Sequence, residues 1–417
     1  MSAGKLGSEH MSNNVVPPRS TVTLSSVDGD LEVGRHSLVK GEGTPPKVDV
    51  SGTVYVEGGC RFECSLSAEN LDGEDDVSIE GDLEIRNRVS VEDGHLTVSG
   101  KMTARRVDID RSLTVRRDFE VDEVDVGGRL TVGGAARVRK IDVGGAFESE
   151  GEVKAESVDV GGSVEIESKV DIEDINVGGK VEVAGGKVGS VDVGGSFVSR
   201  DSLEFQRIDV GGSVKLAGKS NGGDINVGGS CKVKGDLKFS DIDVGGFITI
   251  SGSAEGAGLD VGGKVQVDGD LRLSEKLDVG GVAEIEGELA AQNIDVGGRL
   301  RARKATANAR VSVGGSIETA GGVSASYIRI GRRGRVRGLM KADEVLIGKR
   351  ASVEDVYAKT ITLEREARAR NLYGERIRLE SGCHVYGEVQ YTEGLTEERG
   401  VTLAGASKKV DKLPPSP

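Results

Sequence analysis

Aromatic residues and cysteines are scarce in this chain of 417 residues. It contains no Trp, 7 Phe and 6 Tyr, so aromatic residues make up 3% of the sequence. Because aromatic rings usually anchor the core of a compact domain, we expect an interior built from Val, Ile, Leu and Ala. The 4 cysteines are too few for a disulfide scaffold in so long a chain.

Long apolar runs and a targeting segment are also missing. No apolar run reaches the roughly 18 residues of a transmembrane helix. The first residues, MSAGKLGSEHMSNN, contain no apolar stretch typical of a secretory signal, and they begin Met-Ser rather than the Met-Gly of a myristoylation site. We therefore expect a cytoplasmic protein. The net charge of −14 argues against a general binder of nucleic acids or anionic membranes.

Glycine is abundant, and it marks a repeat. The chain has 64 Gly but only 7 Pro and no Gly-X-Y period, which excludes collagen. Pentads of the type Val-Asp-Val-Gly-Gly recur, and degenerate copies continue them to Gly348. From Gly127 to Gly348 there are 221 residues in 13 steps, an average of 17. The first glycines of the pentads are Gly127, Gly144, Gly161, Gly178, Gly194, Gly211, Gly228, Gly245, Gly262, Gly280, Gly297 and Gly314.

Each repeat contains three pairs of apolar residues. Counted from the first glycine, the pairs stand at +3/+5, +9/+11 and +14/+16, as in Val265/Val267 and Leu271/Leu273. A spacing of two is the period of a β-strand with one buried face. Glycines at 0, +1 and +7 separate the pairs, where the chain must turn. The pattern predicts an all-β, three-sided parallel β-helix with about 17 residues per coil, and the offsets of six, five and six favour the right-handed form.

The repeat also suggests a division of the chain. We expect a disordered tail over 1–20, irregular β-helix coils over 21–106, the regular repeat over 107–348, further coils over 349–405 and a second disordered tail over 406–417. In total this makes about twenty coils.

Three features resemble the bactofilins, a family of polymer-forming cytoskeletal proteins. They are the segment VDGDLEVGRHSLVKG at 27–41, the VDVGG ladder, and the later pattern [Ile/Val]-x-[Ile/Leu]-Gly-x-x-[small]-x-Val. The resemblance covers about 21–405. It implies a right-handed three-sided β-helix between disordered tails, and end-to-end polymerisation without nucleotide into filaments that support cell shape or recruit other proteins. This chain is several times longer than the usual family core, and its VDVGG unit differs from the commoner I-G-x-G-A.

No constellation of residues predicts an enzyme, a cofactor or a metal site. His384 follows Cys383, but Cys383 occupies an inward position and is interpreted as a small core residue rather than a nucleophile. Cys60 and Cys64 are four apart without the further ligands that zinc needs. We therefore predict a non-enzyme with no cofactor, no metal and no small-molecule substrate.

An acidic column accompanies the repeat at position +15. Stacked carboxylates repel one another, so the column is either a ladder for divalent cations or a set of short side chains that cap the following glycine turn. Because Asn176 and Asn226 keep an acceptor but lose the charge, we favour the caps. The column comprises Asp108, Asp125, Asp142, Asp159, Asn176, Asp192, Asp209, Asn226, Asp243, Asp260, Asp278 and Asp295.

Two regions are candidate contact surfaces. Residues 329–378 hold 14 Lys/Arg and 7 Asp/Glu, a net of +7 that leaves −21 for the rest of the chain. This region or the tails could bind an anionic membrane, other proteins or another acidic shaft, whereas nucleic acid is disfavoured; pairing of Arg with Glu between coils is the alternative. At the C-terminal end, Tyr386, Val389, Tyr391 and Leu403 are candidates for a polymerisation surface, because the last coil of a β-helix exposes an unpaired edge.

The sequence thus favours a self-assembling cytoskeletal scaffold of bactofilin type, in the cytoplasm and with membrane association as an option. A cell-surface or exported β-helical adhesin rod is the second hypothesis. An enzyme on a β-helix is the third, and the near-constant step of 17 residues leaves it little loop from which to build a site.

Overall fold

The computed structural model describes residues 14–415, which form β-strands and turns without a helix. Contacts divide the chain into two compact units, one ending at Arg200 and the other beginning at Asp201. Each unit is a parallel β-solenoid, as predicted, and the two units together contain about 23 turns of about 17 residues.

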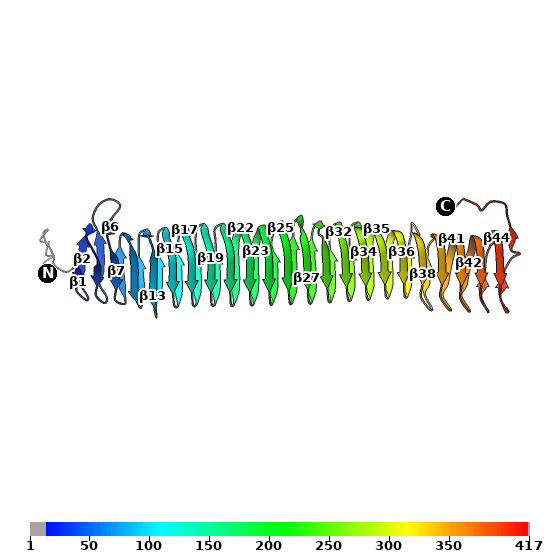
Figure 1. Ribbon diagram of the computed structural model, residues 1–417, viewed down its shortest axis with the longest axis horizontal. Coiled ribbons are helices and arrows are strands. Elements are labelled where there is room, and N and C mark those ends of the chain that lie inside the picture. The colour runs from blue at the N-terminus through cyan, green and yellow to red at the C-terminus, as the bar shows by residue number, and fades with distance from the viewer. Residues whose placement is uncertain (1–13, 416–417) are drawn as a thin grey trace. The chain divides into compact units, whose positions relative to one another are not determined.

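Strands of the first unit follow one another with short turns between them (Figure 1). They are β1 (Val15–Val16), β2 (Thr21–Leu24), β3 (Ser26–Val27), β4 (Leu31–Val33), β5 (Leu38–Gly41), β6 (Lys47–Val50), β7 (Thr53–Val56), β8 (Cys60–Glu63), β9 (Ser65–Ala68), β10 (Asn70–Glu74), β11 (Val77–Ile79), β12 (Leu83–Ile85), β13 (Arg88–Glu92), β14 (His95–Val98), β15 (Met102–Ile109), β16 (Ser112–Val115), β17 (Phe119–Val126), β18 (Arg129–Val132), β19 (Ala136–Val143), β20 (Ala146–Ser149), β21 (Val153–Val160), β22 (Ser163–Val177), β23 (Lys180–Val193) and β24 (Ser196–Ser199).

The second unit has the same construction. Its strands are β25 (Leu203–Val210), β26 (Ser213–Ala217), β27 (Ser220–Val227), β28 (Ser230–Lys234), β29 (Leu237–Lys238), β30 (Asp241–Val244), β31 (Phe247–Ile250), β32 (Ala254–Val261), β33 (Lys264–Val267), β34 (Leu271–Val279), β35 (Val282–Val296), β36 (Arg299–Val313), β37 (Ser316–Thr319), β38 (Val323–Ile330), β39 (Arg335–Arg337), β40 (Met340–Ile347), β41 (Ser352–Leu363), β42 (Arg368–Leu379), β43 (His384–Val385), β44 (Val389–Glu397), β45 (Thr402–Leu403) and β46 (Lys408–Lys409).

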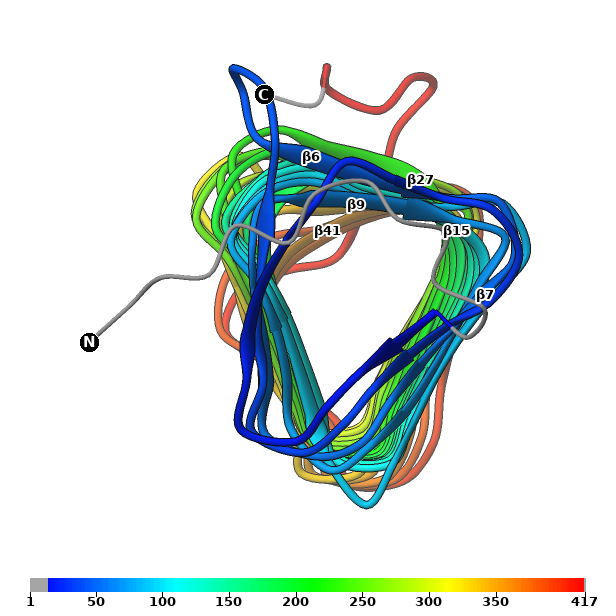
Figure 2. The same cartoon turned by 90° about the vertical axis from the view of Figure 1, so that its left-hand side faces the viewer.

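Every coil has three flat sides, which we call faces A, B and C after the apolar pairs at +3/+5, +9/+11 and +14/+16. Strands pair in parallel with the equivalent strand one coil later, so that Val107 lies beside Val124 and Val124 beside Ile141 on face C. Viewed from the N-terminal side, β6 follows the upper side of a triangle and β7 its right-hand side, joined only by Ser51 and Gly52 (Figure 2). The first unit therefore winds clockwise as it recedes, which makes it right-handed.

Inward residues form a continuous apolar core in each unit. The residues predicted to point inward are buried, among them Val265 and Val267 with no exposure, while the intervening Gln266 is only half-buried. A few aromatic rings fit inside, and two of them, those of Phe205 and Phe239, lie against a glycine of the next coil. Phe205 lies beside Gly222, and a Cβ on that glycine would meet the Phe205 ring at 2.4 Å.

The glycine pairs at the corners have a different role from the one that the sequence suggested. Among them, Gly228, Gly245 and Gly262 do not have the positive φ angles that favour glycine. A Cβ on Gly245 would instead lie 2.5 Å from the carbonyl oxygen of Gly228, and one on Gly262 would lie 2.4 Å from that of Gly245. Glycine is needed here because consecutive backbones stack too closely for a side chain.

Both predicted tails are too long, because each includes a strand. β1 lies within the expected N-terminal tail and pairs with β4, and β46 lies within the expected C-terminal tail and pairs with β44. Hydrophobic spacing missed both because each strand has only two residues. Residues 1–13 and 416–417 lie outside the described residues.

Candidate assembly surfaces

The C-terminal coil leaves part of the core open. In the interior coils the inward residues Ile377 and Val385 are buried, but Leu395 and Leu403, which lie beside them one coil later, are only half-buried. Within the described residues no strand pairs with the outer edges of β45 and β46. The chain after β46 runs back beside the stack, outside the triangle, and does not cross its end (Figures 1 and 2).

The four candidates for a polymerisation surface lie in different environments. Leu403 belongs to an inward column of the last coil and is half-buried. Tyr391 is also half-buried, but it lies on β44, and β46 pairs with that strand on its outer side. Val389 is only 2% exposed, because it lies in the core beside Leu372, so its assignment to an exposed surface was wrong. Tyr386 is 59% exposed but points outward from face A, with its ring 6.4 Å from that of His384. It lies on the flank rather than at the end.

Three further apolar residues at this end were missed. Leu395, Val401 and Val410 are half-buried in the last coil. A signal for the first two was present, because GLTEERGVTL at 394–403 follows the pattern of RIRLESGCHV at 376–385 with a step of 18 residues. The repeat therefore continues through 394–403, within the coils expected over 349–405.

The N-terminal coil is open in the same way. On β2, the inward residues Val22 and Leu24 are half-buried, and Val22 pairs with Val39, which is completely buried. From residue 14 onward, no strand covers the outer edges of β1, β2 and β3. Both terminal coils thus combine unpaired backbone groups with partly exposed apolar side chains, the combination that makes a sheet edge prone to pairing.

The acidic column runs along face C but does not cap the turns. Asp209 accepts hydrogen bonds from Arg207 (3.3 Å) and Asn226 (3.5 Å), and Asp159 accepts one from Ser157 (2.8 Å). In the part of the chain that the structure describes, no backbone N–H donates to a carboxylate of this column, so the capping interpretation was wrong. Partial burial, followed by repulsion from Asp142 and Asp108, raises the pKa of Asp125.

Capping is performed by another set of aspartates, one residue after the glycine at +7. Asp236 accepts the N–H of Ser253 at 2.9 Å, and Asp270 accepts the N–H of Glu288 at 2.9 Å. The latter bond is the main cause that lowers the pKa of Asp270. These side chains join one coil to the next at the corner between faces A and B.

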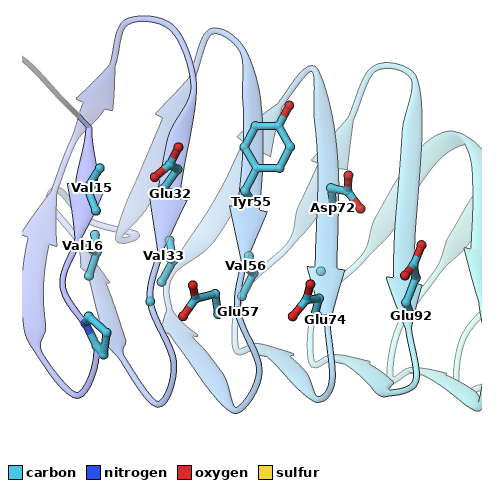
Figure 3. A pocket seen from close by; sticks show the side chains of 13 residues that line it. Val15, Val16, Glu32, Val33, Tyr55, Val56, Glu57, Asp72, Glu74 and Glu92 are labelled. Atoms are coloured by element: carbon cyan, nitrogen blue, oxygen red, sulfur yellow. The ribbon is translucent and has the colours of Figure 1, made fainter.

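An acidic depression of about 490 Å³ lies on face C near the start of the first unit (Figure 3). Glu32, Tyr55 and Asp72 point outward from adjacent strands, and Tyr55 is 44% exposed. Arg35 approaches Glu74 at 3.8 Å. Glu32 and Asp72 have no cation within 4 Å among the described residues.

The basic region of the second unit is partly neutralised by neighbouring coils. Arg337 pairs with Glu318 at 3.7 Å, and Lys359 pairs with Asp343 at 2.7 Å. Pairing of this kind was the alternative to a docking surface. It does not extend to Arg333, Arg335 and Arg368, which make no ion pair with any described residue. A depression of about 870 Å³ lies on face A around Arg299, Arg333 and Arg335.

The thiols are core residues, which confirms the interpretation of Cys383. All four cysteines are buried and none forms a disulfide. Burial raises the pKa of Cys64 to about 11 and that of Cys231 to about 12. Burial also raises the pKa of Cys383, whose Sγ lies 3.2 Å from the carbonyl oxygen of Glu364. The Nδ1 atom of His384 instead contacts the carbonyl oxygen of Gly382 at 3.0 Å, so the two side chains make no dyad.

Within residues 14–415 there is no group of three or more His, Cys, Asp or Glu side chains that could hold a metal ion. The same residues include no helix long and apolar enough to cross a membrane.

Comparisons with protein-family models, with curated proteins and with solved structures find no match for this chain.

Proposed function

We propose that the protein is a structural scaffold that assembles end to end through its two terminal coils, in the manner of the bactofilins that its sequence resembles. The observation that carries the proposal is the open core at both ends. Val22 at one end, and Leu395 and Leu403 at the other, are half-buried although the equivalent residues of the neighbouring coil, Val39, Ile377 and Val385, are buried. Leu24, beside Gly41, is half-buried too. Docking of a second terminal coil would bury these side chains and pair the exposed backbone groups.

The lateral faces support the same proposal. Their outward residues are mostly short, polar or charged, and many are paired between coils, as in Lys101–Glu120 at 2.9 Å and Lys238–Glu255 at 3.0 Å. A catalytic role has less support, because burial raises the pKa of the thiols and the turns between strands are short. We therefore assign the chain a non-enzymatic role in the cytoplasm, where filaments would support cell shape or recruit other proteins.

The test is filament formation by variants of the last coil. Leu403→Arg or Leu395→Arg places a charge in the proposed joint, and we expect either change to shorten or abolish filaments in negative-stain electron microscopy. Thr402→Arg and Thr396→Arg are matched controls, since these neighbouring side chains point outward and are exposed. An end-to-end joint is small, so one charge should have a large effect, whereas the β-rich circular dichroism spectrum should be unchanged.

Variants of the N-terminal coil test whether this coil forms part of the end-to-end joint. Val22→Arg should disrupt filaments, whereas Thr23→Arg, one residue later and exposed, should not. Wild-type protein that remains monomeric in sedimentation velocity experiments at high concentration would refute the proposal. Filaments that survive both the Leu403→Arg and the Val22→Arg changes would show that the joint lies elsewhere.

A further inference from the structure

A column of arginines on face A of the second unit lacks ionic partners. Arg299, Ser316, Arg335, Ser352 and Arg368 lie side by side on consecutive strands and point outward. Because adjacent strands are about 4.8 Å apart, the arginines recur about every 9.6 Å. None of the three makes an ion pair with a described residue. We call these five residues the basic ladder.

The surroundings of the basic ladder add positive charge. The depression around Arg299 and Arg335 also includes Arg333. Its two carboxylates pair with cations that also line the depression, because Glu284 pairs with Lys264 at 2.7 Å and Glu318 pairs with Arg337 at 3.7 Å. Neither carboxylate forms an ion pair with Arg299, Arg333 or Arg335. The ladder is therefore an exposed row of uncompensated cations on a flat sheet.

A row of carboxylates with the same spacing lies on face C of the first unit, where it continues the acidic column from Asp108 toward the N-terminus. Glu32, Tyr55, Asp72, Ser90 and Asp108 are consecutive along the stack, so that a carboxylate occupies every second strand. Glu32 and Asp72 have no cation within 4 Å in residues 14–415, and Asp108 is hydrogen-bonded to Arg88 at 2.9 Å. We call this set the acidic ladder; Figure 3 shows its first three members beside the acidic depression.

We propose that the basic ladder of one chain docks side by side on the acidic ladder of a second copy. The spacing of both ladders is set by the same distance between adjacent strands, so three arginines can meet three carboxylates in register. Between the charges, Ser316 and Ser352 meet Tyr55 and Ser90, which leaves the exposed Tyr55 ring close to arginines, where a cation–π contact is favourable.

A second copy explains more of the surface than another anionic partner does. A polyanion or an anionic membrane would occupy the basic ladder but would leave the acidic ladder without a partner. A second copy uses both ladders at once. This lateral contact is independent of the proposed end-to-end joint, since it involves none of the terminal apolar residues.

The test is a charge exchange in the full chain. One variant carries Arg299→Glu and Arg335→Glu, and the other carries Glu32→Arg and Asp72→Arg. Each variant has two ladders of the same sign, so we expect the wild type's lateral association to weaken at least about tenfold in each. A mixture of the two variants restores opposite ladders and should associate again. Sedimentation velocity at about 0.05 M and about 0.5 M salt should show that salt weakens the contact.

Matched controls separate the ladders from net charge. Lys215→Glu with Lys232→Glu makes the same charge change on face A of the second unit, outside the ladder, and both lysines are exposed. Asp142→Arg with Asp159→Arg does so on face C of the first unit, farther along the stack. We expect both control variants to associate like the wild type.

Several outcomes would overturn the proposal. The first is that the ladder variants associate as strongly as the wild type. The second is that the ladder and control variants lose association to the same extent. The third is that a mixture of the two ladder variants does not associate again. Binding of polyphosphate or of anionic vesicles without any lateral self-association would also overturn it. If Leu403→Arg alone abolished all association, the end-to-end joint would be upheld and docking through the ladders would be refuted. If the Leu403→Arg variant still associated in a salt-sensitive way, docking through the ladders would be upheld.

Discussion

Replacement of a corner glycine by alanine is the sharpest test of how the coils stack. A Cβ on Gly245 would lie 2.5 Å from the carbonyl oxygen of Gly228, about 0.9 Å closer than an ordinary contact of about 3.4 Å. Neither side yields easily, because the contact is with backbone and the neighbouring amide of Gly246 donates to the Gly229 carbonyl at 3.0 Å. The strain must therefore move a carbonyl in the preceding coil.

The magnitude follows from two opposing contributions. Overpacking of this kind costs about 1–3 kcal/mol, and the loss of backbone freedom in the unfolded chain returns about 0.4–1 kcal/mol. We expect Gly245→Ala to lower the free energy of unfolding by about 1–2 kcal/mol. Gly405→Ala is the control, because nothing lies within 4 Å of a Cβ there and its φ is not positive.

Denaturant unfolding measures the total effect, and amide hydrogen exchange locates it. Repeat proteins respond through neighbouring repeats, so exchange should accelerate first in the coils that contain Gly228 and Gly245. A Gly245→Ala protein as stable as the Gly405→Ala control would refute the close backbone approach, and with it the explanation of the repeated glycine pair.

Two further predictions concern the core and the acidic column. Val265→Asp should lower the free energy of unfolding by several kcal/mol, because it buries an unpaired carboxylate. Gln266→Asp, which changes the adjacent outward residue, should lower it by less than about 0.5 kcal/mol. Equal melting temperatures of the two variants would contradict the assignment of inward and outward residues. Asp125→Asn should raise the melting temperature at about pH 7, because the raised pKa of Asp125 means that ionisation is disfavoured in the folded state. As the pH falls through that raised pKa, the wild-type carboxyl takes up a proton and the gain should disappear; a gain independent of pH would point to another cause.

The apolar repeat was enough to predict the architecture. Pairs such as Val265/Val267 recur with a period of two inside a step of 17, and the structure buries them as expected. Alternation of side chains is a local property of a strand, so it can be read without knowing what lies beside the strand. The acidic column and the inward position of Cys383 were predictable for the same reason.

The reasons for individual residues were harder to predict. The glycine pairs were interpreted as turn residues, but in the structure glycine is needed because the backbone of the preceding coil lies too close for a side chain, as at Gly245 beside the carbonyl of Gly228. The aspartates at +15 were interpreted as caps, although Asp236 and its equivalents cap instead. Both errors concern contacts between residues one coil apart, which the spacing within a single coil does not reveal.

The sequence by itself determined the strand period, the number of sides and which residues face the core, because these depend on neighbours along the chain. Only the tertiary structure decided that Leu403 lies in the open last coil, that Val389 is buried in the core beside Leu372 and that Tyr386 lies on the flank. It also decided which charges remain without partners, since Arg335 and Asp72 differ from paired residues only in what the next coil places beside them. Stacking of coils brings together residues about 17 positions apart, and that contact, rather than local pattern, determines exposure and charge balance.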